Sequence, residues 1–169
     1  MKRHPGLVPL SRDHHHGLVM AERLVLGRST NPRADWPSDR AEQAARLVDF
    51  FETDLGPHFE AEEAHVFPVA ARDLADGDGL VQQLVDDHEA MRMMVHELGA
   101  GAVDAAGAGP AFPRDLDERL RAFGERLRRH IRVEERELFE RMQAECSPET
   151  LRGIEARLAA HGTRPACRL

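Results

Sequence analysis

Two segments of the chain repeat a pattern of histidine and glutamate that is typical of metal ligands. HFEAEEAHVF begins at His58, and HIRVEERELF begins at His130. In both, histidine comes first, an apolar residue follows, and Glu-Glu occupies the fifth and sixth positions. Because an α-helix has about 3.6 residues per turn, His58 and Glu62 project from one side of their helix, and so do His130 and Glu134. Each segment therefore offers one imidazole and one carboxylate as a pair.

These pairs lie on the apolar sides of their predicted helices. Leu127, Ile131 and Leu138 are the helical neighbours of His130 and Glu134. Moving an imidazole and a carboxylate into an apolar interior costs several kcal/mol unless a coordinating charge receives them. A metal ion supplies that charge, so the repeat predicts a buried metal site.

Two further histidines, His14 and His88, each follow an aspartate and complete the pattern. His14 precedes His58 by 44 residues and His88 precedes His130 by 42, so the chain divides into two similar helical hairpins. Each hairpin brings one lone histidine and one His-x-x-x-Glu pair. An internal pseudo-twofold arrangement would place both halves around one centre.

The first of these histidines belongs to a run of three. His14, His15 and His16 are consecutive, and a helix turns neighbouring side chains about 100° apart, so at most one of them points directly inward. His14 shares its face with Leu10 and Leu18 and is the favoured candidate. His15 remains the alternative.

The predicted ligand set is thus four imidazoles and two carboxylates. It comprises His14 or His15, His58, Glu62, His88, His130 and Glu134. Six ligands are too many for one structural zinc ion but suit two iron-like ions bridged by the carboxylates. Manganese, zinc and other divalent metals occupy similar nitrogen and oxygen sites.

Apolar periodicity predicts the elements that hold these residues. Helices are expected over 10–26, 80–98 and 148–160. A longer helix is expected from a cap at Ser38 to about residue 74, with a break at Gly56-Pro57. Another is expected from a capping pair of Asp115 and Glu118 to residue 142. The tract 99–113 is expected to be a flexible connection. The predicted fold is all-α: an antiparallel up-down-up-down four-helix bundle with a short C-terminal helix, forming one domain over residues 1–169 with its core at about 10–146.

Composition narrows the functional classes. The 169 residues are 41% hydrophobic and 31% charged, which indicates a folded domain. A formal charge of -7 argues against nucleic acid as a partner. No apolar run reaches the roughly 18 residues that span a bilayer, and the first residues lack a signal-peptide core, so we expect no membrane association and a cytoplasmic location. Cys146 and Cys167 are expected to be free thiols.

The successive motifs DHHHGL, HFEAEE, DHEAM and HIRVEE resemble those of the hemerythrin-like (HHE cation-binding) proteins over residues 10–142. The resemblance implies a bundle that holds two iron ions in a non-heme di-iron centre with an oxo or hydroxo bridge. It assigns Glu62 and Glu134 as bridging ligands, with the histidines as terminal ligands.

Two positions depart from the oxygen-carrying hemerythrins, which place a second histidine four residues after the third-helix ligand and use His-x-x-x-x-Asp on the fourth helix. Here the first position is Arg92, and the fourth helix has Glu134 at four and Glu135 at five. Glu63 and Glu135 are open as ligands, as groups that orient an imidazole, or as surface residues.

One fewer ligand leaves an open coordination position. We therefore expect a protein that binds, senses or reacts with a small ligand, namely oxygen, nitric oxide or peroxide. Peroxide or nitric-oxide chemistry would make it an enzyme. The alternative is an iron-handling or metal-controlled helical interaction module without catalysis. The sequence identifies no protein partner.

Overall fold

The computed structural model describes residues 3–103 and 115–161, and all regular structure in these ranges is helical. The elements are η1 (Pro5–Leu7), α1 (Val8–Leu26), α2 (Arg40–Phe50), η2 (Phe51–Leu55), α3 (Gly56–His65), α4 (Phe67–Asp73), α5 (Gly77–Val103), α6 (Leu116–Val133), η3 (Glu134–Leu138), α7 (Phe139–Glu145) and α8 (Pro148–His161). This confirms the all-α prediction.

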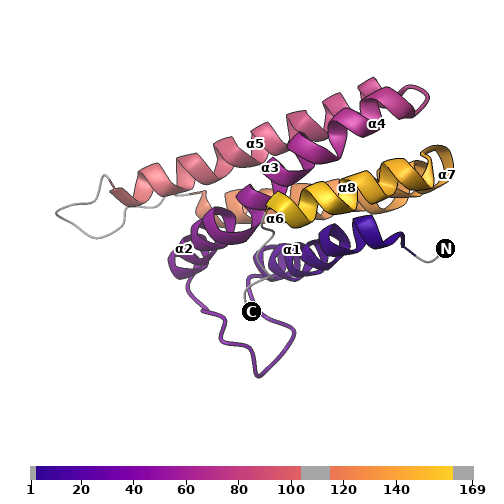
Figure 1. Ribbon diagram of the computed structural model, residues 1–169. Coiled ribbons are helices and arrows are strands. Elements are labelled where there is room, and N and C mark those ends of the chain that lie inside the picture. The colour runs from indigo at the N-terminus through magenta and orange to yellow at the C-terminus, as the bar shows by residue number, and fades with distance from the viewer. Residues whose placement is uncertain (1–2, 104–114, 162–169) are drawn as a thin grey trace.

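Consecutive elements combine into the four arms of a bundle (Figure 1). The first arm is α1, the second runs from α2 through η2 and α3 to α4, the third is α5, and the fourth runs from α6 through η3 to α7. α1 packs along α6, α4 along α5, and α5 along α6, which is the packing of a helical bundle. α8 is the predicted terminal helix, and it packs on η1 and α3.

Glycines allow α1 and α6 to approach closely. A Cβ atom on Gly124 of α6 would lie 2.7 Å from the backbone oxygen of Ala21, and one on Gly17 of α1 would lie 2.8 Å from Ile131 Cδ1. Both distances are shorter than real Cβ contacts. Ile131 Cδ1 is the end of a side chain and can shift, but Ala21 O is backbone, so a side chain at position 124 would push the helices apart. The pairs 17 with 131 and 21 with 124 also show that the two helices are antiparallel.

The core is divided into two apolar clusters, with polar side chains between them along each arm. On α1, Leu10 belongs to one cluster and Met20 to the other, and His14 lies between them. On α5, Leu84 and Met91 flank the buried His88 in the same way. The apolar clusters therefore seal a polar layer from water on both sides.

The second arm breaks where a proline removes a backbone donor. The π-helical turn η2 ends at Leu55, and α3 restarts at Gly56 with Pro57 in its first turn, as predicted. A second break at Val66 was not predicted. Pro68 in the first turn of α4 explains it, because proline cannot donate to the preceding turn of α3.

The helix ends differ from the prediction at two caps. Asp39, not Ser38, caps α2 by accepting hydrogen bonds from Ala41 N and Glu42 N. Asp115 precedes α6, but its side chain caps nothing, because its carboxylate accepts from Arg119 Nε at 3.0 Å instead. The predicted capping pair is therefore wrong.

The third arm is longer than predicted at both ends. α5 begins at Gly77, directly after Asp76, whose φ of 53° turns the chain. Helical backbone then continues to Val103, which occupies the beginning of the tract expected to be flexible. The rest of that tract, 104–113, lies outside the described residues.

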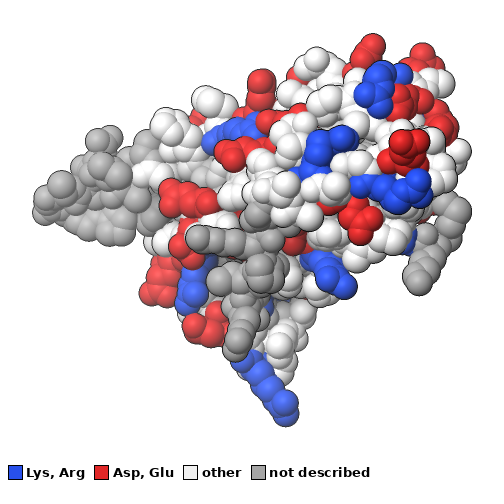
Figure 2. Space-filling view, viewed as in Figure 1, with Lys and Arg blue, Asp and Glu red and all other residues white. Residues whose placement is uncertain are grey.

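The visible surface carries both signs of charge in close alternation (Figure 2). Arg121 on α6, for example, pairs with Asp117 one turn earlier at 2.7 Å. Such exposed pairs contribute little to stability and keep the surface solvated. Of the helices in the described ranges, none has the length and apolarity needed to cross a membrane.

Candidate metal centre

Six side chains from all four arms converge in the polar layer. They form two overlapping groups of possible metal ligands, the first being His14, His58, Glu62 and Glu134 and the second Glu62, His88, His130 and Glu134. Within each group one ligand atom per residue lies within 4.8 Å of the others, and all six residues are buried. Glu62 and Glu134 belong to both groups, which is the arrangement expected of carboxylates shared by two ions.

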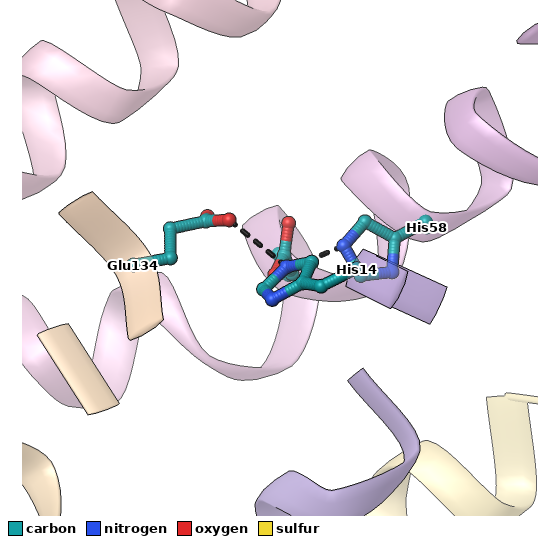
Figure 3. A group of neighbouring side chains, drawn as sticks. His14, His58 and Glu134 are labelled. Atoms are coloured by element: carbon teal, nitrogen blue, oxygen red, sulfur yellow. Dashed lines mark ion pairs between the residues drawn. The ribbon is translucent and has the colours of Figure 1, made fainter. Parts of the chain in front are cut away.

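The first group lies between α1, α3 and the start of η3. His14 Nε2 lies 3.0 Å from Glu134 Oε2 and 3.5 Å from Glu62 Oε1. His58 Nε2 lies 3.2 Å from the same Glu62 oxygen. Figure 3 shows the His14 ring between His58 and the Glu134 carboxylate, and the rings of His14 and His58 meet edge to face.

The second group lies between α3, α5 and α6. His130 Nε2 is 3.3 Å from Glu134 Oε2, and His88 Nε2 is 3.7 Å from Glu62 Oε2. The Nε2 atoms of His88 and His130 are 3.0 Å apart. In both groups the inward atom of every ring is therefore Nε2, and the carboxylates lie between the two pairs of rings.

Each ring directs its other nitrogen, Nδ1, at an outer carboxylate. The four nearest carboxylates are Glu135 for His14 at 2.7 Å, Glu63 for His88 at 2.7 Å, Asp13 for His58 at 3.4 Å and Asp87 for His130 at 3.8 Å. The last separation is too long for a hydrogen bond. Two of these carboxylates directly follow a central glutamate, and two directly precede a central histidine. The outer carboxylates therefore show the same twofold repeat as the six central side chains. Such partners fix the orientation of a ligating ring and increase its basicity.

Arginines in turn hold most of the outer carboxylates. Arg92 donates to both oxygens of Glu63 at 2.9 and 3.1 Å. Arg3 donates to Glu135 at 2.6 Å. Arg126 and Arg129 both contact Asp87. In the described part of the chain no arginine or lysine pairs with Asp13, whose ionic partner is His58, so the two halves of the centre differ there.

The pKa values show how strongly the centre favours positive charge. Burial lowers the pKa of His58 and His130, but the nearby Glu62 and Glu134 carboxylates outweigh it and raise each to about 9. Burial likewise raises the pKa of Glu134, but His130 and His14 bring it well below its usual value. Two carboxylates that remain ionised in a dry interior form a site for cations.

Several polar atoms of the centre have no hydrogen-bond partner. They include His14 Nε2 and both carboxylate oxygens of Glu62 and Glu134, although the two glutamates are fully buried. A buried polar atom without a partner is strongly unfavourable. Coordination to metal ions would satisfy all five atoms with the nitrogen and oxygen donors that iron and similar metals use. The residues present therefore fit a pair of metal ions.

The structure brings together six of the seven residues singled out in the sequence. The seventh, His15, is exposed and lies in neither group, so His14 is the first-arm histidine that enters the centre. Glu63 and Glu135, left open by the sequence, contact Nδ1 atoms. The roles of Asp13 and Asp87 were missed, although their repeated position before a histidine was the signal that could have indicated them.

The fold and the centre together define a helical-bundle domain with a buried histidine and glutamate site for cations. The family model of the hemerythrin HHE cation binding domain matches residues 8–142, and the chain belongs to that family. Comparisons with curated proteins and with solved structures gave no match.

Proposed function

We propose that this protein binds two iron ions and that the pair binds, senses or reacts with oxygen, nitric oxide or peroxide. The observation that carries this proposal is the sharing of Glu62 and Glu134 between two ligand groups, with all four carboxylate oxygens buried and without another partner. One ion would lie on the His14 and His58 side. The other would lie on the His88 and His130 side.

The number of ligands supports binding of an external molecule. Each ion would have two imidazoles and two shared carboxylates. Iron accepts up to six ligands, so positions remain for a small molecule. Arg92, at the position where oxygen-carrying relatives have a further histidine, is engaged with Glu63 and adds no ligand. When bound, the iron pair would supply Lewis acidity and exchange electrons with that molecule.

The chain's own residues provide positioning and a dry environment. The apolar clusters on either side keep water from the centre, which strengthens its electrostatic interactions. Phe59 stacks on His88 with ring centroids 3.6 Å apart, and Phe139 stacks on His14 at 5.5 Å. Together with the Nδ1 contacts, these rings hold the imidazoles in one orientation.

The buried free thiol of Cys146 supports a reducing compartment such as the cytoplasm.

Metal content tests this proposal. Protein produced in iron-replete medium should contain two irons per chain, and Glu62→Ala should lose most of both because each ion loses a shared ligand. His15→Ala is the matched control, since His15 is exposed beside the centre, and it should retain two irons. Fewer than one iron in the wild-type protein, or an unchanged content in Glu62→Ala, would overturn the proposal.

The buried charges also favour a second candidate, a helical module whose folding is controlled by metal. Without a cation, the Glu62 and Glu134 carboxylates repel each other in the interior, and only the neighbouring histidines offset that repulsion. Metal binding would then be coupled to folding. Hydrogen exchange of α1, α3, α5 and α6 with and without iron separates the candidates. Equal protection in the two states would exclude the metal-controlled module.

A further inference from the structure

A second pair of histidines meets at the surface, away from the buried centre. His65 is the last residue of α3, and His161 is the last residue of α8. His65 Nε2 and His161 Nδ1 are 3.0 Å apart, and the two ring centroids are 4.9 Å apart at an interplanar angle of 79°. His161 is exposed and His65 is half-buried. Residues far apart in sequence thus bring two imidazole nitrogens together.

The same separation occurs between two nitrogens of the buried centre. His88 Nε2 and His130 Nε2, which belong to one ligand group, are also 3.0 Å apart. Imidazole nitrogens bind transition metals at about 2.0–2.1 Å. Two nitrogens 3.0 Å apart can therefore bind one ion at an angle near 90°, which matches adjacent positions of the square-planar or octahedral geometry of copper(II) and nickel(II).

The surroundings of His65 favour its neutral ring. Burial first, and then the nearby His161 and Arg157, lower the pKa of His65. Within the described ranges neither ring is paired with a carboxylate that would hold a proton on it. Neutral imidazole is the form that binds a metal. A hydrogen bond between the rings uses only one lone pair, and a bound ion would use both.

We propose that His65 and His161 form a surface site for a late first-row divalent metal ion, with copper(II) bound most tightly, and that the ion links α8 to α3. Water completes the coordination because two protein ligands leave most positions open. The family match ends at residue 142, so His161 lies outside the matched domain and the ion connects that domain to the helix that follows it.

A metal ion bound by His65 and His161 would add a polar link to α8, which otherwise packs on the rest of the protein through apolar side chains. α8 packs into the core through Leu151, Ile154 and Leu158, and these side chains lie in the same apolar cluster as Leu7 and Leu10. The histidine pair lies at the far end of α8, after the last of these contacts. A bound ion would therefore hold the end of the helix that apolar packing leaves unsecured, and amide exchange there would slow.

Copper(II) titration of the full-length, iron-loaded protein tests the proposal, with electron paramagnetic resonance to detect nitrogen ligands and iron analysis to detect displacement. We expect one equivalent bound with a two-nitrogen signature while the iron content stays constant. His65→Ala and His161→Ala should each weaken binding at least tenfold. His96→Ala, which removes an exposed histidine of α5, is the matched control and should bind as wild type.

Hydrogen exchange supplies a second readout. One equivalent of copper(II) should slow exchange at the end of α8 in the wild type and in His96→Ala, but not in the two pair variants. Equal copper affinity in all four proteins, or displacement of iron as the only event, would overturn the proposal. The pair variants distinguish the two sites, because removing His65 or His161 weakens copper binding at the surface and leaves the buried centre intact.

Discussion

His88 Nε2 and His130 Nε2 lie 3.0 Å apart in the interior, and the His88 ring is oriented from outside by the contact of its Nδ1 atom with Glu63. One proton can lie between two imidazole nitrogens, so a metal-free centre tolerates this approach only when at least one of the facing nitrogens carries no proton. A metal ion removes that restriction, because both lone pairs then point at one cation. Metal binding therefore explains directly why these two rings lie so close together in one half of the centre.

Arg92 should act on the metal through Glu63 and His88. We expect Arg92→Ala to leave the fold intact and to lower metal affinity by about tenfold, because partners of this kind contribute about 10–100-fold. Titration of the metal-free protein with iron(II) measures the change. Arg119→Ala is the control, since Arg119 forms only surface pairs with Glu97 and Asp115. If the Arg92 variant bound iron(II) as tightly as the control, Arg92 would not act on the metal through Glu63 and His88.

Metal uptake should release protons at pH 7. His58 and His130 have pKa values raised to about 9 in the metal-free protein, so both rings are protonated at pH 7 and must lose that proton to bind a metal. Apparent affinity should therefore rise as the pH increases from 6 to 8. Calorimetry in two buffers of different ionisation enthalpy measures the protons released. An affinity that is constant from pH 6 to 8 would show that the rings are already neutral.

The close contact between α1 and α6 should make Gly124 intolerant of any side chain. Gly124→Ala places a methyl group 2.7 Å from Ala21 O, and we expect it to destabilise the protein by about 1–3 kcal/mol. Gly79→Ala is the control, because nothing lies within 4 Å of its new methyl group and alanine favours helix by up to about 1 kcal/mol. Denaturant unfolding of the metal-free proteins compares them. Equal stability of the two variants would mean that the helices are farther apart than described.

Asp13, which pairs with His58 and with no arginine or lysine of the described residues, should distinguish the two halves of the centre. Asp13→Asn removes a negative charge beside His58, whereas the corresponding Asp87 is already neutralised by arginines. We expect Asp13→Asn to weaken one of the two metal-binding steps by several-fold and to leave the other nearly unchanged. Stepwise titration resolves the two constants. An equal loss in both steps would show that the charge acts on the whole centre and not on one half.

The sequence predicted the arms and the six side chains that converge between them, because both follow simple periodicity. His58 and Glu62 repeat as His130 and Glu134, and the break at Pro57 follows from its missing donor. The outer contacts could not be predicted from a local sequence pattern. Arg3 and Glu135, for example, are 132 residues apart in the chain and meet only in the folded protein. The prediction that Asp115 caps its helix was wrong because Arg119, one turn later, donates to the same carboxylate.

The most direct test of the central claim is a crystal structure of the iron-loaded protein with anomalous scattering measured at the iron edge. The account predicts two iron peaks per chain, one beside His14 and His58 and one beside His88 and His130, with Glu62 and Glu134 contacting both. A single peak, or iron located only outside this layer, would contradict it.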